Sequence, residues 1–133
     1  MRKILLDTST YVGFLRGNEK VLTYLARADS IYMSVVVLGE LYAGFRAGKK
    51  ERENRQILER FLSKSTVTIL EATIETADIF GLIITSLKKS GTPIPVNDVW
   101  IAAHALETGS ILVTYDDQFA VIPGLRLWDE IGH

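Results

Sequence analysis

The sequence contains no cysteine, only two histidines and only three prolines. Without cysteine, the chain has neither a disulfide scaffold nor a thiolate metal site. A zinc site is not expected either, because zinc in proteins is bound mainly by cysteine and histidine. A metal ion bound to this chain would therefore be held by oxygen ligands.

Long apolar runs and an excess of positive charge are also missing. A basic start at residues 1–3 is followed by only three apolar residues, 4–6, which is shorter than the core of a signal peptide. No stretch approaches the length needed to span a bilayer. We therefore expect a cytoplasmic protein with no membrane partner. The net charge of −1 gives no overall attraction to nucleic acid, so a polyanion would need a local basic patch or metal ions.

The composition is that of an ordinary globular protein. The 133 residues are 47% hydrophobic and 23% charged, and no repeat, linker or low-complexity tract interrupts them. This length is sufficient for one domain with a real core, which we assign to residues 1–133.

Short apolar runs typical of buried parallel strands alternate with longer segments of helical periodicity. We expect strands at 4–6, 31–33, 66–70, 111–114 and 125–127, and helices at 11–15, 19–28, 35–45, 49–62, 71–90 and 98–108. Segment 35–45 begins with β-branched residues, but it is too long for most strands and follows Ser34, a plausible N-cap. The alternation predicts an α/β fold, a three-layer α/β/α sandwich around a central, mainly parallel sheet of four or five strands.

Two of the predicted strands run directly into acidic residues. Asp7 follows strand 4–6, and the pair Asp116 and Asp117 follows strand 111–114. In an open parallel sheet, ligands bind in the crevice beyond the carboxyl ends of the strands, so Asp7 and Asp116 should meet there. Either aspartate taken alone also fits a helix cap or an Asx-turn.

Two further carboxylates, those of Glu40 and Asp98, are candidates to lie beside Asp7 and Asp116. Glu40 is flanked on its predicted helix by apolar residues such as Val36 and Val37, a setting in which a carboxylate is normally paired or bound to a cation. The alternative is that this face is exposed. Asp98 opens the helix at 98–108, where it could act as the N-cap, and it shares a side with Ile101.

Four carboxylates brought together repel one another, and some take up protons unless a cation compensates them. Mg²⁺ or Mn²⁺ fits an acid-only site, because these ions prefer carboxylate oxygen and water. Such a site implies phosphoryl chemistry, in which the metal activates water and offsets negative charge. Ser9 and Thr114, beside the acids, are candidates to orient a carboxylate or a water molecule.

Several segments, in order and in register, resemble the PIN domain family, and more narrowly the VapC-type toxins of toxin–antitoxin pairs. They are Asp7–Ser9, Val35–Gly44, Asn97–Ala105, Leu112–Phe119 and Ile122–Leu125. The resemblance extends from residue 4 to about residue 127. It implies a parallel sheet between helices, a Mg²⁺- or Mn²⁺-dependent endoribonuclease, a homodimer, and a cognate antitoxin whose tail covers the groove.

The resemblance also implies roles for individual residues. The four family acids fall on Asp7, Glu40, Asp98 and Asp116. The three aspartates would bind the metal, and Glu40 would bind it directly or through water. Asp117 could share or replace the role of Asp116. The supporting polar residues would be Ser9, Thr114 and Asn97. Tyr115 departs from the pattern, since many relatives carry a basic residue there.

Basic and aromatic residues are candidates for RNA contacts. The basic candidates are Arg46, Lys49, Lys50, Arg52 and Arg55 beyond the Glu40 segment, with Arg16, Lys88 and Lys89 elsewhere. A solvated helix face with charge pairs four residues apart is the alternative for the main cluster. The aromatic candidates for base stacking are Tyr11, Phe14 and Tyr115, each of which could instead belong to the core.

Two other functions remain as alternatives. An aspartate-dependent phosphatase or phosphoacceptor domain would need a second acid close after Asp7 or a lysine after strand 111–114, and the sequence has neither. A catalytically silent PIN-like binding module would have no use for four clustered acids. His104, in mid-helix, is assigned no catalytic role, and Trp100 and Trp128 are assigned to packing.

Overall fold

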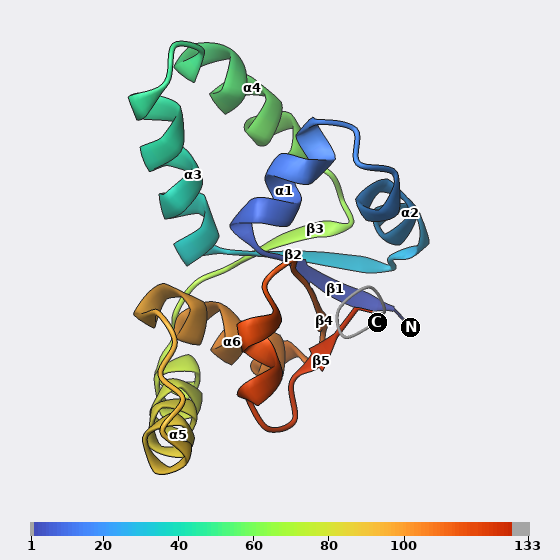
Figure 1. The fold of residues 1–133 in the computed structure, drawn as a ribbon. Coiled ribbons are helices and arrows are strands. Elements are labelled where there is room, and N and C mark those ends of the chain that lie inside the picture. Colours follow the sequence, from blue (N-terminus) through green and yellow to red (C-terminus); the bar gives the residue numbers. More distant parts are fainter. Residues whose placement is uncertain (1, 129–133) are drawn as a thin grey trace.

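The computed structural model describes residues 2–128 and contains one five-stranded sheet (Figure 1). The strands are β1 Lys3–Leu6, β2 Ser30–Ser34, β3 Val67–Leu70, β4 Ile111–Val113 and β5 Arg126–Leu127. They lie in the order β3-β2-β1-β4-β5, and every neighbouring pair is parallel. The predicted α/β class and parallel sheet are confirmed.

Six α-helices flank the sheet in two layers (Figure 1). Those drawn above it are α1 Thr8–Leu15, α2 Glu19–Arg27, α3 Val35–Ala47 and α4 Glu51–Leu62. Those drawn below it are α5 Ile74–Ser90 and α6 Val96–Thr108, beside the short 3₁₀ helix η1 Asp117–Val121. Within residues 2–128, no helix combines the length and apolar character that crossing a bilayer requires.

The strand order reverses beside the central strand β1. The chain proceeds from β1 through β2 to β3 on one side, and then returns to place β4 and β5 on the other. Strands β1 and β4 pair in register from Ile4 opposite Ile111 to Leu6 opposite Val113. In such sheets the crevice beyond the carboxyl ends opens at this reversal point. The fully buried side chains of β1, which are Ile4, Leu5 and Leu6, anchor this strand in the core.

Several predicted helix starts are wrong, and each error has a local cause. Helix α1 begins at Thr8, three residues early, because Asp7 caps it. Helix α5 begins at Ile74 rather than 71, because Thr73 forms a capping box with Thr76. Helix α6 begins at Val96, directly after Pro95, so Asp98 lies within the first turn and is not the N-cap.

Helix α3 confirms that segment 35–45 is helical, and it extends to Ala47. The Ser34 hydroxyl accepts a hydrogen bond from the backbone N of Val36 at 3.1 Å, as an N-cap residue should. The apolar side chains Val37, Leu38 and Leu41 are buried against the core. Helix α3 therefore starts at the carboxyl edge of the sheet, where the N-terminal half of the helix can reach the crevice.

His104 joins three segments on the α6 side of the sheet. Its side chain is fully buried, with Nδ1 2.8 Å from Ser34 Oγ and Nε2 3.1 Å from the Glu71 carbonyl oxygen. A carbonyl only accepts, so Nε2 carries the proton and Nδ1 accepts from the Ser34 hydroxyl. Burial lowers the pKa of His104, which favours this neutral form. The residue has a structural role at the end of β2.

The neutral His104 should make folding stability depend on pH. The unfolded imidazole titrates near pH 6.5, and the folded one titrates lower. The unfolded chain therefore binds more protons below about pH 6.5, and the stability that His104 contributes is lost as pH falls toward its folded pKa. We expect the free energy of unfolding, measured with urea, to fall more steeply between about pH 7 and 5.5 in the wild type than in His104→Gln. Identical slopes in the two proteins would contradict this.

Candidate functional site

Asp7 stands at the carboxyl end of β1 and is only 7% exposed. Its Oδ1 caps α1, accepting hydrogen bonds from the Thr10 backbone N at 3.0 Å and the Thr10 hydroxyl at 2.9 Å. The Ser9 hydroxyl donates to the same oxygen at 3.0 Å. Asp7 is thus a helix cap, as one interpretation of the sequence suggested, but the capping hydrogen bonds use only one of its two carboxylate oxygens.

The other oxygen of Asp7 is tied to strand β4. The Thr114 hydroxyl donates to Asp7 Oδ2 at 2.5 Å and accepts from the backbone N of Asp116 at 3.0 Å. The Trp128 indole N–H donates to the Thr114 carbonyl at 2.6 Å and secures the end of β4 from the opposite side. One buried hydroxyl therefore links Asp7 and Asp116 at the same edge of the sheet.

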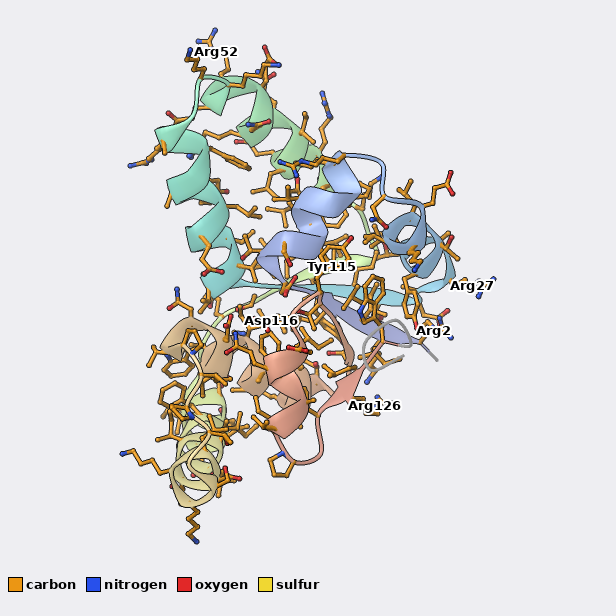
Figure 2. The ribbon with its side chains drawn as sticks, viewed as in Figure 1. Arg2, Arg27, Arg52, Tyr115, Asp116 and Arg126 are labelled. Carbon is orange, nitrogen blue, oxygen red and sulfur yellow. The ribbon has the colours of Figure 1, made fainter. Side chains whose placement is uncertain are left out.

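Asp116 caps the 3₁₀ helix η1 and is half-buried. Its Oδ1 accepts from the Gln118 backbone N at 3.0 Å, and its Oδ2 from the Gln118 side-chain amide at 2.5 Å. Figure 2 places Asp116 near the centre of the molecule, close to Tyr115. Asp117 is exposed and begins η1. Of the two neighbouring acids, Asp116 is the one whose charge acts on Asp98.

Glu40 connects three helices at this edge. The Thr8 hydroxyl, at the start of α1, donates to Glu40 Oε1 at 2.5 Å. The Asn97 side-chain amide, at the start of α6, donates to Glu40 Oε2 at 3.3 Å. The sequence indicated that Glu40 would need a partner, and its partners are these neutral polar groups from α1 and α6.

The pKa of Asp98 reflects the charges around it. Its pKa is raised to about 6, first by burial and then by the negative charges of Asp116, Glu40 and Asp7. A like charge raises the pKa of a carboxyl only when it lies nearby in a partly desolvated space. Asp7 and Asp116, at the ends of β1 and β4, and Glu40, on α3, therefore lie within electrostatic reach of Asp98 on α6, and hydrogen bonds through Thr114 and Asn97 link these segments.

Within residues 2–128, no lysine or arginine forms an ion pair with any of these four acids. Among the same residues, no three acidic or histidine side chains lie close enough together to bind one metal ion directly. The donor set consists of oxygen atoms and fits a hard cation. Mg²⁺ in particular keeps several waters and takes one or two carboxylates, so it does not require three preassembled protein ligands.

Three residues of this site had not been singled out from the sequence. Thr10 and Gln118 follow Asp7 and Asp116 at the spacing of side-chain caps, which is a local signal that could have identified them. Thr8 binds Glu40 across 32 positions of sequence, so no local pattern reports that contact.

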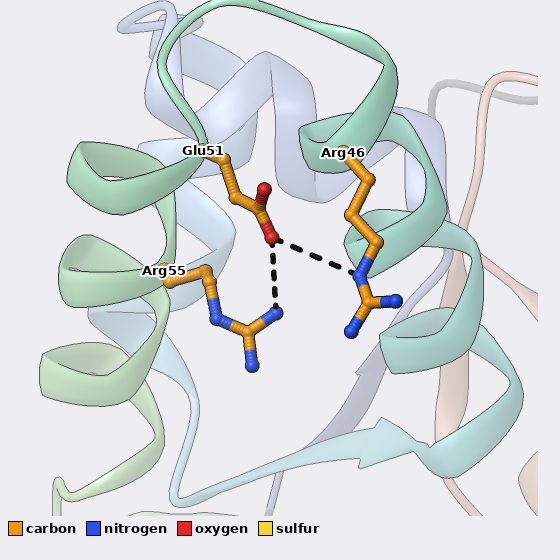
Figure 3. A network of polar contacts seen from close by, with 3 residues as sticks. All are labelled: Arg46, Glu51 and Arg55. Carbon is orange, nitrogen blue, oxygen red and sulfur yellow. Dashed lines mark ion pairs between the residues drawn. The ribbon is translucent and has the colours of Figure 1, made fainter.

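The main cluster of basic residues lies away from the acids, at the far end of α3. Arg46 and Arg55 both approach the carboxylate of Glu51, each at 3.7 Å (Figure 3), and the Arg55 guanidinium lies 4.5 Å from the centre of the Tyr42 ring. Lys49 and Lys50 are exposed next to this network, and Arg52 marks the tip of the molecule, remote from Asp116 in Figure 2. This arrangement matches the alternative of a solvated face with charge pairs.

The aromatic candidates divide into buried and exposed residues. Tyr11 is fully buried, and Phe14 packs against Tyr11 and Phe61 with ring centres 5.9 and 5.3 Å apart. Tyr115 is 46% exposed, and its pKa is raised by partial burial and by the charge of Asp7. Arg16 is exposed and shares a groove with Tyr115 and Ser9. Of the three rings, Tyr115 is the one open to a ligand beside the acids.

Repulsion among the four acids should lower the free energy of unfolding. Between about pH 4 and 6 the folded state holds a proton on Asp98 that the unfolded state has released, so the charged Asp98 destabilises the fold above about pH 6. We expect Asp98→Asn to raise the free energy of unfolding at pH 7 in EDTA by about 1 kcal/mol after solvent screening, with no gain near about pH 4. Urea titrations at both pH values measure this.

The exposed Asp78→Asn on α5 serves as the matched control and should change little. A less stable Asp98→Asn protein at pH 7 would show that the carboxylate acts mainly in stabilising the first turn of α6.

Comparison with known proteins extends over nearly the whole chain. The ribonuclease VapC2 of Rickettsia felis is 35% identical over 112 residues, covering 82% of each protein. The tRNA(fMet)-specific endonuclease VapC of Salmonella typhimurium is 28% identical over 132 residues, covering 97% of this chain and 98% of the relative.

Solved structures agree in fold. The crystal structure of VapBC2 from Rickettsia felis bound to a promoter DNA fragment matches with a TM-score of 0.82 and 31% identity, covering 95% of this chain and 97% of that one. DNA-bound VapBC from Salmonella typhimurium matches with a TM-score of 0.84 and 28% identity, covering 96% and 98%. The family model for the PIN domain matches residues 4–125. The chain therefore belongs to the PIN domain family, and its relatives there include VapC ribonucleases.

Proposed function

We propose that this protein is a Mg²⁺- or Mn²⁺-dependent endoribonuclease and the toxin of a type II toxin–antitoxin pair. The observation that carries the proposal is the grouping of Asp7, Glu40, Asp98 and Asp116 beyond the carboxyl ends of β1 and β4, where the charges of the other three acids raise the pKa of Asp98. Such a site is built to receive a cation together with a phosphate. The VapC relatives named as ribonucleases support the same chemistry.

In this proposal the three aspartates would hold the ion, directly or through its bound water molecules, and Glu40 would bind it directly or through water. When bound, the ion supplies activation of water and offsets the negative charge that develops at the phosphodiester. Without an ion the pKa of Asp98 is raised to about 6, and a bound cation would favour its charged form by offsetting the like charges around it. Glu40, fixed by Thr8 and Asn97, is held ready to accept a proton from the attacking water.

The hydroxyls around Asp7 keep its carboxylate in one orientation. Ser9 and Thr10 bind Oδ1 and Thr114 binds Oδ2, which limits rotation of the group. Carboxylate ligands held in this way do not have to be ordered when the substrate arrives. The positioning residues are therefore as much a part of the proposed site as the four acids.

The partners proposed are RNA, a cognate antitoxin and a second copy of this chain. The matched structures from Rickettsia felis and Salmonella typhimurium are of VapBC assemblies, which supports an antitoxin partner. Exposed apolar side chains at Ile74 and Leu82 on α5 and Val96 on α6 offer a surface for self-association. An RNA substrate would place the activity in the cytoplasm.

The proposal is tested by incubating the protein with mixed cellular RNA and mapping the cut ends. We expect internal cuts with Mg²⁺ or Mn²⁺ and none with EDTA, because the acids alone cannot offset charge at the phosphate. Asp7→Asn, Asp98→Asn and Asp116→Asn should each abolish cleavage while thermal unfolding stays cooperative. Asp117→Asn, which alters the exposed neighbour of Asp116, should remain active.

Cleavage that persists in the Asp98→Asn protein would contradict the assigned site. Release of phosphate from a small phosphomonoester without cuts in RNA would favour an aspartate-dependent phosphatase. An intact fold with neither activity would favour a silent binding module.

Metal binding is tested independently of activity by thermal unfolding. An ion that binds the native state alone raises the Tm in proportion to the logarithm of its concentration. We expect Mg²⁺ or Mn²⁺ at about millimolar concentration to raise the Tm of the wild type and of Asp117→Asn, with little rise for Asp7→Asn. An equal rise in all three proteins would place the ion elsewhere.

A further inference from the structure

A groove leads away from the acid cluster along α1. It has a volume of about 530 Å³, and its lining includes Ser9, Gly13, Arg16, Asn18 and Tyr115. Ser9 belongs both to this groove and to the acid cluster, since its hydroxyl binds Asp7 at 3.0 Å. Tyr115 immediately precedes Asp116 in the chain. The groove therefore adjoins the proposed reaction centre at Ser9 and Tyr115.

The Tyr115 ring packs against Trp128 and Gly13, and the residue remains partly exposed. The buried Trp128 contacts it in a T-shaped arrangement, with ring centres 5.7 Å apart at an interplanar angle of 62°. On the other side it lies against Gly13, where an added Cβ would stand 2.7 Å from the Tyr115 hydroxyl oxygen and 3.4 Å from Cε2. The absence of a side chain at Gly13 therefore allows the ring to lie against α1, with 46% of the residue exposed.

The lining of this groove carries one charge, and that charge is positive. Its lining contains one cation, the exposed Arg16, and no carboxylate among Ser9, Val12, Gly13, Arg16, Gly17, Asn18 and Tyr115. The groove on α4 differs, because Glu51 and Glu59 line it together with its cations, and Arg55 already approaches Glu51. An anionic polymer that extends from the acids past Ser9 and Tyr115 would meet the exposed Arg16 in the same groove.

We propose that this groove is a subsite for one nucleotide of single-stranded RNA, with the base stacked on Tyr115 and a neighbouring phosphate bound by Arg16. The inference rests on the proposed ribonuclease function and adds the position of a flanking nucleotide. Every base has a π-face, so stacking on Tyr115 would add affinity with little sequence preference. Bases in a duplex are not free to stack on a side chain, so the subsite selects unpaired loops and ends.

The test compares Tyr115→Ala and Tyr115→Leu, which remove the aromatic ring, with Tyr115→Phe, which keeps it. Binding of a fluorescein-labelled single-stranded oligoribonucleotide is followed by anisotropy in EDTA, and cleavage of the same RNA is followed with Mg²⁺. Stacking on one aromatic ring predicts a Kd and a KM raised about tenfold in the Ala and Leu proteins, with kcat nearly unchanged. Tyr115→Phe should stay within about twofold of the wild type.

Arg16→Ala should weaken binding and lower the slope of log Kd against log salt by about 0.7, as expected for one lost phosphate contact with a single strand. Arg27→Ala is the matched control, since Arg27 is exposed at the end of α2, away from Asp116 in Figure 2. It should leave both the affinity and the slope as in the wild type. The Tm of every variant is measured to confirm that it is folded.

A wild type that cuts RNA while Tyr115→Ala keeps its Kd and KM would overturn the subsite and leave the proposed function intact. An equal loss of RNA affinity in Tyr115→Phe would show that the Tyr115 hydroxyl, and not stacking on the ring, binds the RNA. That result would also overturn the proposed subsite. Unchanged RNA affinity with weaker binding of the antitoxin would assign the groove to a protein partner instead. A wild type that neither binds nor cuts RNA would remove the proposed function itself.

Discussion

The hydrogen bond from the Thr114 hydroxyl to Asp7 Oδ2 is the contact on which the rest of the site depends. It joins the two strands at the reversal point of the sheet, and through the backbone N of Asp116 it places a second carboxylate beside the first. Both partners are almost fully buried, so neither could lose the other without leaving an unsatisfied polar group. The Trp128 indole then secures the Thr114 carbonyl from the other side. The carboxyl ends of β1 and β4 are thus joined by hydrogen bonds where the acids meet.

Electrostatic repulsion is the opposing constraint. The charges of Asp7, Glu40 and Asp116 raise the pKa of Asp98, so the folded chain without an ion holds a destabilising arrangement of like charges. Neutral donors from other elements partly compensate it, because Thr8 and Asn97 bind Glu40 and Gln118 binds Asp116. These hydrogen bonds keep the carboxylates oriented without neutralising them. The remaining charge is available to a cation.

Much of the architecture was accessible from local patterns. The apolar run 4–6 predicted a doubly buried strand, and the structure confirms it in β1. The placement of Asp7 and Asp116 followed from the rule that parallel strands end at a common edge. The helical assignment of segment 35–45 also proved correct. The start of α6 was misplaced because Asp98 was taken as the first residue of the helix, whereas the N-cap is Pro95 and Asp98 lies in the first turn.

The sequence by itself determined the parallel α/β framework and singled out four candidate acids, because apolar runs, helical periodicity and the ends of strands are patterns of neighbouring residues. Tertiary packing alone decided the contact between Thr8 and Glu40, which are 32 positions apart, and the contact between Thr114 and Asp7, which are 107 apart. It also decided that Tyr11 is buried while Tyr115 stays open beside the acids. The physical reason is that an aromatic side chain has no intrinsic exposure: the surfaces packed around it determine whether solvent or a ligand can reach the ring.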